Sequence, residues 1–318
     1  MSTYLGTTGG KIQNYATDPA NPINGQVWYN VDTGTLKGFK VLAGAWSSGG
    51  DLNTARTQLA GAGTQTAALG FGGYTSTYLA ITESYNGTNW TEVNDLNTAR
   101  NRLTGAGTQP AALAFGGSTP GVVAVTESWN GTNWTEVNDL NTARRDLGGA
   151  GTSTSALAMG GQPTPDKAET ELWNGTNWTE VNDLNFGRVE IATAGASNTS
   201  VLAFGGILDS TTDSTESWNG TNWTELNAMT RALGAMRQLA GAGIQTSALA
   251  FGGGSPSALT ESWNGTNWTE LGDLSTGRTY LAGCGASNTS ALAFGGSPAT
   301  AATEEWNSGP ATVTITTD

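Results

Sequence analysis

One short segment, Thr126–Glu136 (TESWNGTNWTE), recurs along this chain and constrains what the chain can fold into. Near-copies occupy residues 82–92, 170–180, 215–225 and 260–270, and a degraded sixth copy begins at residue 303. The central Asn-Gly pair predicts a tight β-hairpin with a type I′ turn, whose two central residues both need φ > 0. Trp129 and Trp134 flank the turn, where cross-strand aromatic packing stabilises the two arms. Because one such hairpin would be marginal alone, six of them predict a repeat architecture.

A Gly-Gly pair precedes each copy and sets the length of the repeat. The first glycines of these pairs are spaced 44, 44, 45, 47 and 43 residues apart, beginning at Gly72. Such a period is typical of propeller blades or of a solenoid. Each unit divides into a Gly/Ala-rich strand, a second strand that ends at the Gly-Gly pair, and the two hairpin arms. Four antiparallel strands repeated radially favour a β-propeller over a β-solenoid, whose usual repeats are much shorter.

The sequence therefore predicts an all-β chain with a six-bladed β-propeller over residues 45–318. The blade repeats start near residues 51, 95, 139, 183, 232 and 273. Residues 1–44 are predicted to form an extended and β-hairpin attachment segment, with strands over 26–30 and 35–42. Two closures of the ring stay open: the strand that contains Trp46 supplies the outer strand of the last blade, or residues 311–317 take that place. We favour the strand of Trp46, since it retains the Trp and the Asp-Leu-Asn sequence that follows it in the repeat.

Charge and composition argue against several classes of function. Lys and Arg number 13 against 26 Asp and Glu, a formal charge of −13 that argues against nucleic acid or an anionic membrane surface as the main partner. The sequence has no apolar run long enough for a membrane-spanning helix. Histidine, the commonest general base and metal ligand, is absent. We therefore expect a protein that is not an enzyme, with no catalytic residues, no cofactor and no metal.

The loops of such a repeat sort onto two faces, because antiparallel strands alternate in direction. The Thr-Gln turns and the Asn-Gly-Thr-Asn turns share a face that is nearly identical from unit to unit. The loops after the Gly-Gly pairs share the other face with the Asp-Leu-Asn-Thr-Ala-Arg connections, and they differ in every unit. A rigid scaffold with diversified loops is typical of binding proteins, although loops that drift freely in solvent would give the same pattern. The candidate binding residues on this face are Tyr74, Tyr78, Asp166, Lys167, Asp209, Asp213, Arg231 and Arg237.

An arginine and a glutamate also recur once in almost every unit. A ring of arginines is one way to build an anion site. We favour the interpretation that each arginine pairs with carboxylates or loop carbonyls of its own or the next blade, since the pair recurs from unit to unit. The members of this predicted structural ring are Arg56, Arg100, Arg144, Arg188, Arg278, Glu83, Glu127, Glu171, Glu216, Glu261 and Glu305.

The fifth unit departs from the pattern. Three residues are inserted between Trp223 and Leu239, and Met236 falls where arginine is expected, with Arg231 and Arg237 nearby. The irregular loop over residues 227–237 is therefore a candidate site where the symmetry of the ring is broken.

The repeat resembles the Kelch repeat. The pattern of a hydrophobic strand, Gly-Gly, two aromatic residues and an arginine is represented by Phe115-Gly116-Gly117, Trp129, Trp134 and Arg144, and it extends from Asp51 to Trp306. The near-identical repeats and the N-terminal segment PINGQVWYN, followed by DTGTLKG, also look like structural proteins of marine tailed phages. That second resemblance implies a tail-fibre, receptor-binding or capsid-decorating protein of the phage particle.

Three functional hypotheses follow. The favoured one is a non-enzymatic virion component that binds other virion proteins through the N-terminal segment and a host-surface glycan or protein through the variable loops, either alone or as a homo-oligomer. An intracellular Kelch-type adaptor for a protein partner is the alternative. A glycan-cleaving enzyme with paired carboxylates is the least favoured, since no pair stands out in near-symmetric repeats. None of the three involves nucleic acid or membrane insertion.

Overall fold

The computed structural model describes residues 12–20, 22, 25–163, 168–208, 210–231, 234 and 236–315. Every element assigned among them is a β-strand, which confirms the predicted all-β class. The chain divides into two compact units, one of Met1–Ala45 with Asn307–Asp318 and one of Trp46–Trp306. We call them unit 1 and unit 2 and describe each by itself.

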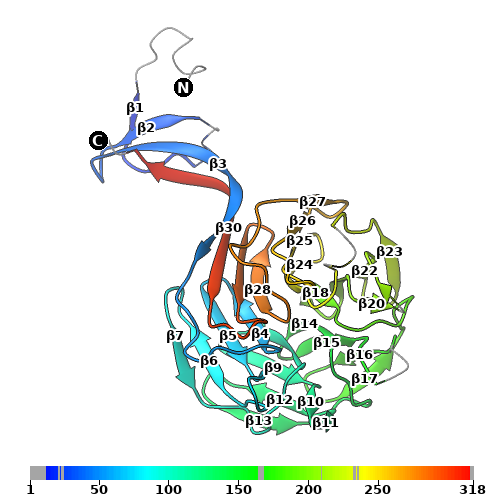
Figure 1. Cartoon of the computed structure of the whole chain (residues 1–318). Coiled ribbons are helices and arrows are strands. Elements are labelled where there is room, and N and C mark those ends of the chain that lie inside the picture. Colours follow the sequence, from blue (N-terminus) through cyan, green and yellow to red (C-terminus); the bar gives the residue numbers. More distant parts are fainter. Residues whose placement is uncertain are drawn as a thin grey trace. The chain divides into compact units, whose positions relative to one another are not determined.

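Repeated four-stranded antiparallel sheets make up most of unit 2 (Figure 1). The first contains β4 (Ala60–Thr64), β5 (Ala67–Phe71), β6 (Thr82–Tyr85) and β7 (Trp90–Val93). The second contains β8 (Thr104–Thr108), β9 (Ala111–Phe115), β12 (Thr126–Trp129) and β13 (Trp134–Val137). The third contains β14 (Gly148–Thr152), β15 (Ser155–Met159), β16 (Thr170–Trp173) and β17 (Trp178–Val181). The fourth contains β18 (Ala192–Ser197), β19 (Ser200–Phe204), β22 (Thr215–Trp218) and β23 (Trp223–Leu226), and the fifth contains β24 (Ala240–Ile244), β25 (Ser247–Phe251), β26 (Thr260–Trp263) and β27 (Trp268–Glu270).

One further sheet contains strands from both ends of the chain. Its order is β1-β2-β3-β30-β29-β28, with β28 at Ala282–Ser287, β29 at Ser290–Phe294, β30 at Thr303–Thr314 and β3 at Thr35–Ser48. The neighbour of β30 is therefore β3, the strand that contains Trp46. Two short ribbons, β10 with β11 (Ser118–Thr119, Gly121–Val122) and β20 with β21 (Ile207–Leu208, Ser210–Thr211), lie in loops that follow Gly-Gly pairs. The predicted blade-like repetition of four-stranded sheets is confirmed.

The hairpin around each Asn-Gly pair is present, but the predicted turn type is wrong. Trp129 pairs with Trp134 across the strands, which leaves four residues in the loop, and the two rings lie 5.4 Å apart between centroids. Gly131 has φ +92°, whereas Asn130 is not among the residues with positive φ. Instead, the Asn130 side-chain oxygen accepts hydrogen bonds from the backbone N–H groups of Thr132 and Asn133, at 3.0 and 2.9 Å. This Asx-type capping stabilises a longer loop than a type I′ turn.

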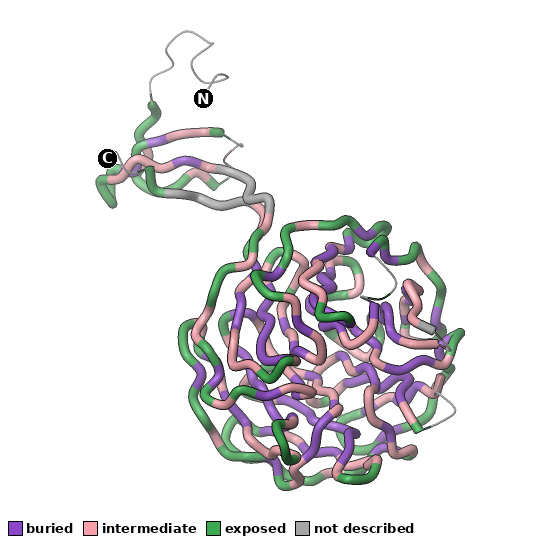
Figure 2. Tube along the Cα trace, in the orientation of Figure 1, coloured by how far each residue is buried: buried purple, intermediate pink, exposed green. Residues whose placement is uncertain are grey.

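The innermost strands are rich in small residues because large rings pack against them. A Cβ added at Gly105 of β8 would lie 2.5 Å from Cζ of Phe71, and at Gly61 of β4 it would lie 2.8 Å from Cζ of Phe294. The second strands are almost wholly buried, with the Leu and Phe positions of β9 at 0% exposure. Figure 2 shows this buried interior and the exposed outer parts of unit 2.

The hydrophobic core of unit 2 lies between sheets. Each of six clusters combines residues of two neighbouring sheets: Leu69 and Phe71 pack with Trp129 and Trp134, for example, and Phe294 packs with Trp90. The innermost strands contact one another in the order β4, β8, β14, β18, β24 and β28, and β28 contacts β4. Hydrogen bonds repeat the same order at the outer strands, where each second Trp donates its indole N–H to a Thr of the preceding sheet at 2.9–3.1 Å.

Unit 1 contains β1 (Gln13–Tyr15), which pairs in parallel with β2 (Val27–Asn30), and the β2–β3 hairpin that the sequence predicted near these bounds. Asp18 organises it: its carboxylate accepts hydrogen bonds from Trp28, Asn30 and Lys37 at 3.1, 2.8 and 2.9 Å. The predicted division at residues 44 and 45 differs at the other end of the chain. Asn307–Asp318 belong to unit 1 rather than to the repeat, because β30 continues beyond Trp306 beside β3 and Ile315 donates its N–H to the Leu36 carbonyl.

Candidate functional site

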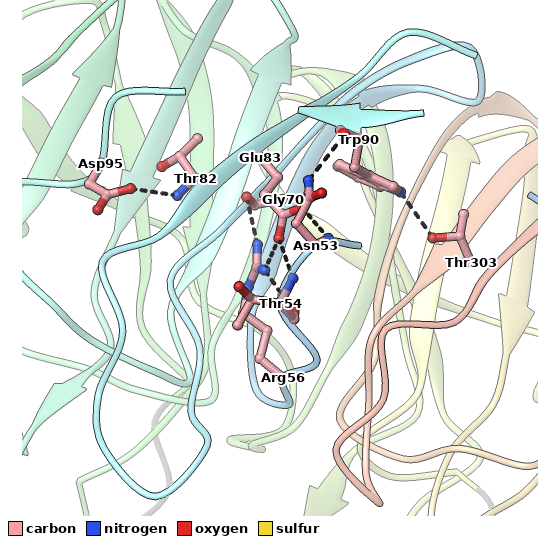
Figure 3. Close-up of polar contacts among 9 residues, drawn as sticks. All are labelled: Asn53, Thr54, Arg56, Gly70, Thr82, Glu83, Trp90, Asp95 and Thr303. Atoms are coloured by element: carbon pink, nitrogen blue, oxygen red, sulfur yellow. Dashed lines mark hydrogen bonds and ion pairs between the residues drawn. The ribbon is translucent and has the colours of Figure 1, made fainter. Parts of the chain in front are cut away.

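Six buried Arg–Glu pairs join the connection before each sheet to that sheet's third strand. Figure 3 shows one: Glu83 accepts hydrogen bonds from Arg56, from the N–H and side chain of Asn53, and from the N–H of Thr54, while Arg56 also donates to the Gly70 carbonyl at 3.1 Å. The arginine and glutamate side chains of the six pairs are at most 5% exposed. A buried charge without a partner costs several kcal/mol of desolvation free energy, so each guanidinium and each carboxylate needs these partners.

The backbone of the same arginines holds the preceding sheet. The Arg100 carbonyl accepts the N–H of Gly73, and the Arg56 carbonyl accepts the N–H of Gly296. The Gly-Gly pairs permit this close approach, because Gly73 and Gly296 have φ +114° and +120°, which glycine adopts without steric cost. With the side chain in its own sheet and the carbonyl on the sheet before it, each of these arginines except Arg231 fastens two sheets together. These guanidinium groups are buried and are not placed to receive an external anion.

Two predictions about these residues need correction. The partner of Arg278 is Glu304, at 2.8 Å, and not Glu305, whose carboxylate instead accepts a hydrogen bond from the Tyr85 hydroxyl at 2.6 Å. Side chains alternate along a strand, so the two adjacent glutamates point to opposite sides of β30. Arg231 is not an exposed loop residue: it is 6% exposed and pairs with Glu261 at 3.1 Å.

The insertion in the fifth unit divides the arginine's two tasks between two residues. Arg231 supplies the buried guanidinium, which donates to Glu261 and to the carbonyls of Gly252 and Ala250. Met236, which stands at the arginine position, is 1% exposed and supplies the carbonyl that accepts the Gly206 N–H at 2.6 Å. The symmetry of the ring is therefore kept in its contacts although it is broken in the sequence.

The other loop residues that the sequence predicted are not gathered into one site. Tyr74 and Tyr78 are half-buried and contact each other, with ring centroids 5.6 Å apart. Asp213 is half-buried, and its carbonyl accepts the N–H of Met229. Arg237 is half-buried, and its backbone carbonyl accepts the Gly254 N–H. Asp166, Lys167 and Asp209 lie outside the described residues.

A second ring, which the sequence analysis missed, lies just before the six innermost strands. One residue of each repeat occupies the same place, two positions after the conserved arginine or Met236, and each has a positive φ between 52° and 57°. Left-handed backbone is strained for residues other than glycine, by about 1–2 kcal/mol each. A cavity of about 100 Å³ lies among these residues. We call them the mouth ring; its members are Gln58, Arg102, Asp146, Glu190, Gln238 and Tyr280.

Backbone hydrogen bonds connect neighbouring members of the mouth ring. Among its described residues, five backbone N–H groups donate to the carbonyl of a neighbouring member at 2.8–3.0 Å. The side chains form two networks. Arg102 pairs with Asp146 at 3.0 Å and lies over the Tyr280 ring, 5.4 Å from its centroid. Glu190 Oε1 accepts hydrogen bonds from Tyr280 and Gln238 at 2.8 and 2.9 Å.

The electrostatics of the mouth ring differ from those of an open loop. The pKa of Asp146 is raised to about 6, mainly by burial. The charge of Arg102 lowers this pKa, and the charge of the nearby Glu190 raises it. Burial, followed by the charge of Glu190, raises the pKa of Tyr280. Tyr280 therefore stays a hydrogen-bond donor at neutral pH. The result is a compact site with two carboxylates, one guanidinium, two amides and a phenol.

One signal in the sequence could have revealed this ring. Two residues stand between the recurrent arginine, which is Met236 in the fifth repeat, and the recurrent leucine, which is Ile191 in the fourth. The second of them is Gln, Arg, Asp, Glu, Gln or Tyr. A position that changes its chemistry inside a nearly constant frame is a candidate for binding, but its φ cannot be read from residues of these types.

Comparison with known proteins adds no family: no protein-family model matches the chain, and no curated protein does. The part of the chain that the structure describes has no helix long and apolar enough to span a bilayer. Within that part, no group of three or more His, Cys, Asp or Glu side chains is placed to hold a metal ion.

Proposed function

We propose that this protein is a non-enzymatic binding module, and that it binds its ligand on the face that carries the mouth ring and the loops after the Gly-Gly pairs. The observation that carries the proposal is the mouth ring. Six equivalent positions keep the same strained backbone conformation and hold five different residue types in a polar network around a cavity. A purely structural position in this repeat, such as the Arg–Glu pair, is instead nearly constant.

The proposed scaffold is a closed, six-bladed, Kelch-like propeller. Three cyclic sets of contacts support six blades: the six innermost strands, the six hydrophobic clusters between sheets, and the six Trp-to-Thr hydrogen bonds. In each set the last sheet contacts the first. On this interpretation, β3 is the outer strand of the sixth blade. A closed ring has no free sheet edge, which limits edge-to-edge association.

We further propose that the protein is a component of a phage particle that adheres to the host surface, by a glycan or a protein. Support comes from the resemblance of the N-terminal segment and of the pure repeats to phage structural proteins. Unit 1 is then the part that binds other virion proteins, consistent with the exposed Ile12, Tyr29, Val31 and Ile315. An intracellular adaptor is the competing function.

Two experiments test these proposals. Mass spectrometry and cryo-electron microscopy of purified particles should find the chain at the tail, at the fibre tips or over the capsid, and its absence would favour the adaptor. Binding of the labelled protein to host cells should fall in Tyr280→Ala and Tyr74→Ala variants, which change the proposed binding face. Thr176→Ala, in an exposed turn at the opposite ends of the strands, is the matched control and should bind as the parent does. Equal binding by all the variants would refute the assignment of the face.

A further inference from the structure

We propose that one face of the sheet in unit 1 is a dimer interface, and that its occupant is the same face of a second copy of this chain. We call it the Tyr29 face, the side of the sheet of β1, β2, β3 and β30 on which the Tyr29 side chain lies. The proposal concerns unit 1 alone and goes beyond the ligand binding that we propose for unit 2.

Most of the exposed large apolar side chains among the described residues belong to unit 1, although unit 2 is much the larger of the two. Of six such side chains, unit 2 has only Phe186 and Ile244. Apolar residues that stand singly on a surface need no explanation, but a contiguous group indicates an interaction site. The other four are 37–48% exposed and are Ile12, Tyr29, Val31 and Ile315.

The strand register places Ile315 on the Tyr29 face. Tyr29 of β2 is paired with Leu36 of β3, so the two side chains point to the same side of the sheet. The Leu36 carbonyl accepts the N–H of Ile315. A Cβ added at Gly38, which by alternation shares the side of Leu36, would lie 3.2 Å from Cδ1 of Ile315. The Ile315 side chain therefore lies on the same side as Tyr29.

Alternation along the strands adds Val31 and Ile12. Val31 is two residues beyond Tyr29, and its N–H donates to the Tyr15 carbonyl, so the pleat of β2 continues to it. Asn14 of β1 is paired with Tyr29, and Ile12 is two residues before Asn14. All four exposed apolar side chains of unit 1 thus share the Tyr29 face. Among the strand residues whose side chains the structure describes, none on this face is charged.

The opposite face of the sheet is already covered by the chain itself. Trp28 and Lys37 are paired across β2 and β3 on that side, and Trp28 is fully buried. Asp18 accepts hydrogen bonds there from Trp28, Asn30 and Lys37. The exposure of Tyr29 shows that no described element covers the other side in the same way. An apolar sheet face is normally buried against a second layer, and unit 1 lacks that layer.

Unit 1 also lacks two of the usual means by which small domains are stabilised. It consists of Met1–Ala45 and Asn307–Asp318. Small domains bury a low fraction of their surface, and those that need support obtain it from disulfides, metals or oligomerisation. The chain's one cysteine, Cys284, lies in unit 2, and the described residues of unit 1 include no group of side chains that could hold a metal ion. Of the three means, oligomerisation remains.

The distribution of charge favours a second copy as the occupant. Unit 1 has three lysines and three aspartates, so its formal charge is zero and the −13 of the chain falls entirely on unit 2. Two copies therefore repel each other through their unit 2 surfaces and can approach most readily through unit 1. An uncharged apolar face is complementary to itself, and two such faces related by a two-fold axis cover each other and close the assembly. Sheets pack face to face in this way about 10 Å apart.

Such a dimer leaves a surface for the attachment that we propose for unit 1. Among the described strands, β1 stands at the end of the sheet order, and its outer edge is not part of a face-to-face contact. The edge of a strand can pair with an extended segment of another protein.

Analytical ultracentrifugation of the full chain between 2 and 200 µM tests the proposal. We expect the weight-average mass to rise from 32.5 kDa toward twice that value. Raising NaCl from 50 to 500 mM should tighten the dimer at least twofold, because salt screens the repulsion between the acidic unit 2 surfaces and does not weaken an apolar contact. Tyr29→Lys should weaken association at least tenfold. Phe186→Lys makes a similar change at an exposed apolar position of unit 2 and should leave association unchanged.

A mixture of two variants separates a lost contact from a lost fold. Tyr29→Glu should be monomeric, as Tyr29→Lys is, but an equimolar mixture of the two should dimerise, because opposite charges then face each other across the interface. A variant in which unit 1 does not fold would show no such recovery.

Four results would overturn the inference: a monomer throughout the concentration range, full association in Tyr29→Lys, a dimer that salt weakens, or a mixture that stays monomeric. The host-cell assay distinguishes this failure from failure of the proposed function. If the chain stays monomeric but Tyr280→Ala reduces adhesion, the binding face of unit 2 is correct and the Tyr29 face is left for another protein of the particle. If the chain dimerises but neither Tyr280→Ala nor Tyr74→Ala affects adhesion, the dimer interface is correct and the proposed binding face is wrong.

Discussion

Removal of one member of a buried Arg–Glu pair should destabilise unit 2 far more than the loss of an ordinary surface charge. The Arg100 and Glu127 side chains are both fully buried, and they lie 2.5 Å apart between Nη1 and Oε1. Glu127 also accepts hydrogen bonds from the backbone N–H groups of Asn97 and Thr98, at 2.6 and 3.3 Å. Glu127→Ala would therefore leave the two backbone donors without an acceptor, and it would leave the buried guanidinium without its carboxylate, with backbone carbonyls such as that of Ala114 as its only acceptors.

The expected cost of Glu127→Ala is about 3–5 kcal/mol, the range for a buried ion pair that loses one partner. Urea unfolding followed by tryptophan fluorescence measures the change in the free energy of unfolding. Glu136 is the matched control: it lies directly opposite Glu127 on the neighbouring strand and is exposed. Glu136→Ala should change stability by less than about 0.5 kcal/mol.

A double variant tests the reasoning itself. Replacing both members by apolar residues, Arg100→Met with Glu127→Leu, removes the stranded charge, so it should be less destabilised than Glu127→Ala alone. If Glu127→Ala costs no more than Glu136→Ala, or if the double variant is the worse of the two, the buried pair does not stabilise its sheet as the geometry implies.

Three further changes give separate predictions. Gly105→Ala should cost about 1–3 kcal/mol in thermal or chemical unfolding, because the new methyl overlaps a phenylalanine ring, whereas Gly121→Ala, which has open space, should be neutral. Thr82→Val should cost about 1–3 kcal/mol, because it leaves the buried indole N–H of Trp134 without its acceptor at 3.0 Å; a neutral result would show that water replaces the hydroxyl. The pKa of Asp146 is about 6 in the folded protein, against an ordinary value of 3.8. The protonated carboxyl therefore contributes stability that is fully present below pH 3.8 and is lost as the pH rises through about 6. Asp146→Asn should therefore gain stability relative to the parent between pH 4 and 7, by about 3 kcal/mol at most, and a constant difference across that range would contradict the pKa.

The repeat made the sheets predictable, because spacing and side-chain size are visible in the sequence. Glycine stands at the position of Gly105 in every repeat except the fourth, which has Thr193, and this recurrence identified the strand where neighbours crowd. The turn was harder. Asn-Gly is a signal for a type I′ turn, but Asn130 uses its side-chain oxygen to cap two N–H groups, and composition alone does not distinguish these two uses of asparagine.

Pairing partners were predictable where a copy can be aligned with the repeat, even a degraded one. In the degraded copy, alignment of Thr303 with Thr126 places Glu304, and not Glu305, at the position of Glu127, so the repeat itself held the correct partner of Arg278. Arg231 was beyond such alignment. Its role depends on how the inserted residues turn back toward Glu261, which is a tertiary contact with no local pattern.

The mouth ring shows why variation within a repeat is more informative about binding than its constant residues. The constant residues satisfy one another within or between neighbouring sheets, so their constancy has a structural cause. At the mouth-ring positions glycine would relieve the left-handed strain, and the chain uses 46 glycines elsewhere, often at positive φ. None stands at these six positions. Six strained residues at about 1–2 kcal/mol each are a large cost beside a typical net stability of about 5–15 kcal/mol. Their side chains contribute hydrogen bonds and charges that glycine cannot, and we propose that the cavity lined by these carboxylates, amides and phenol uses them for recognition.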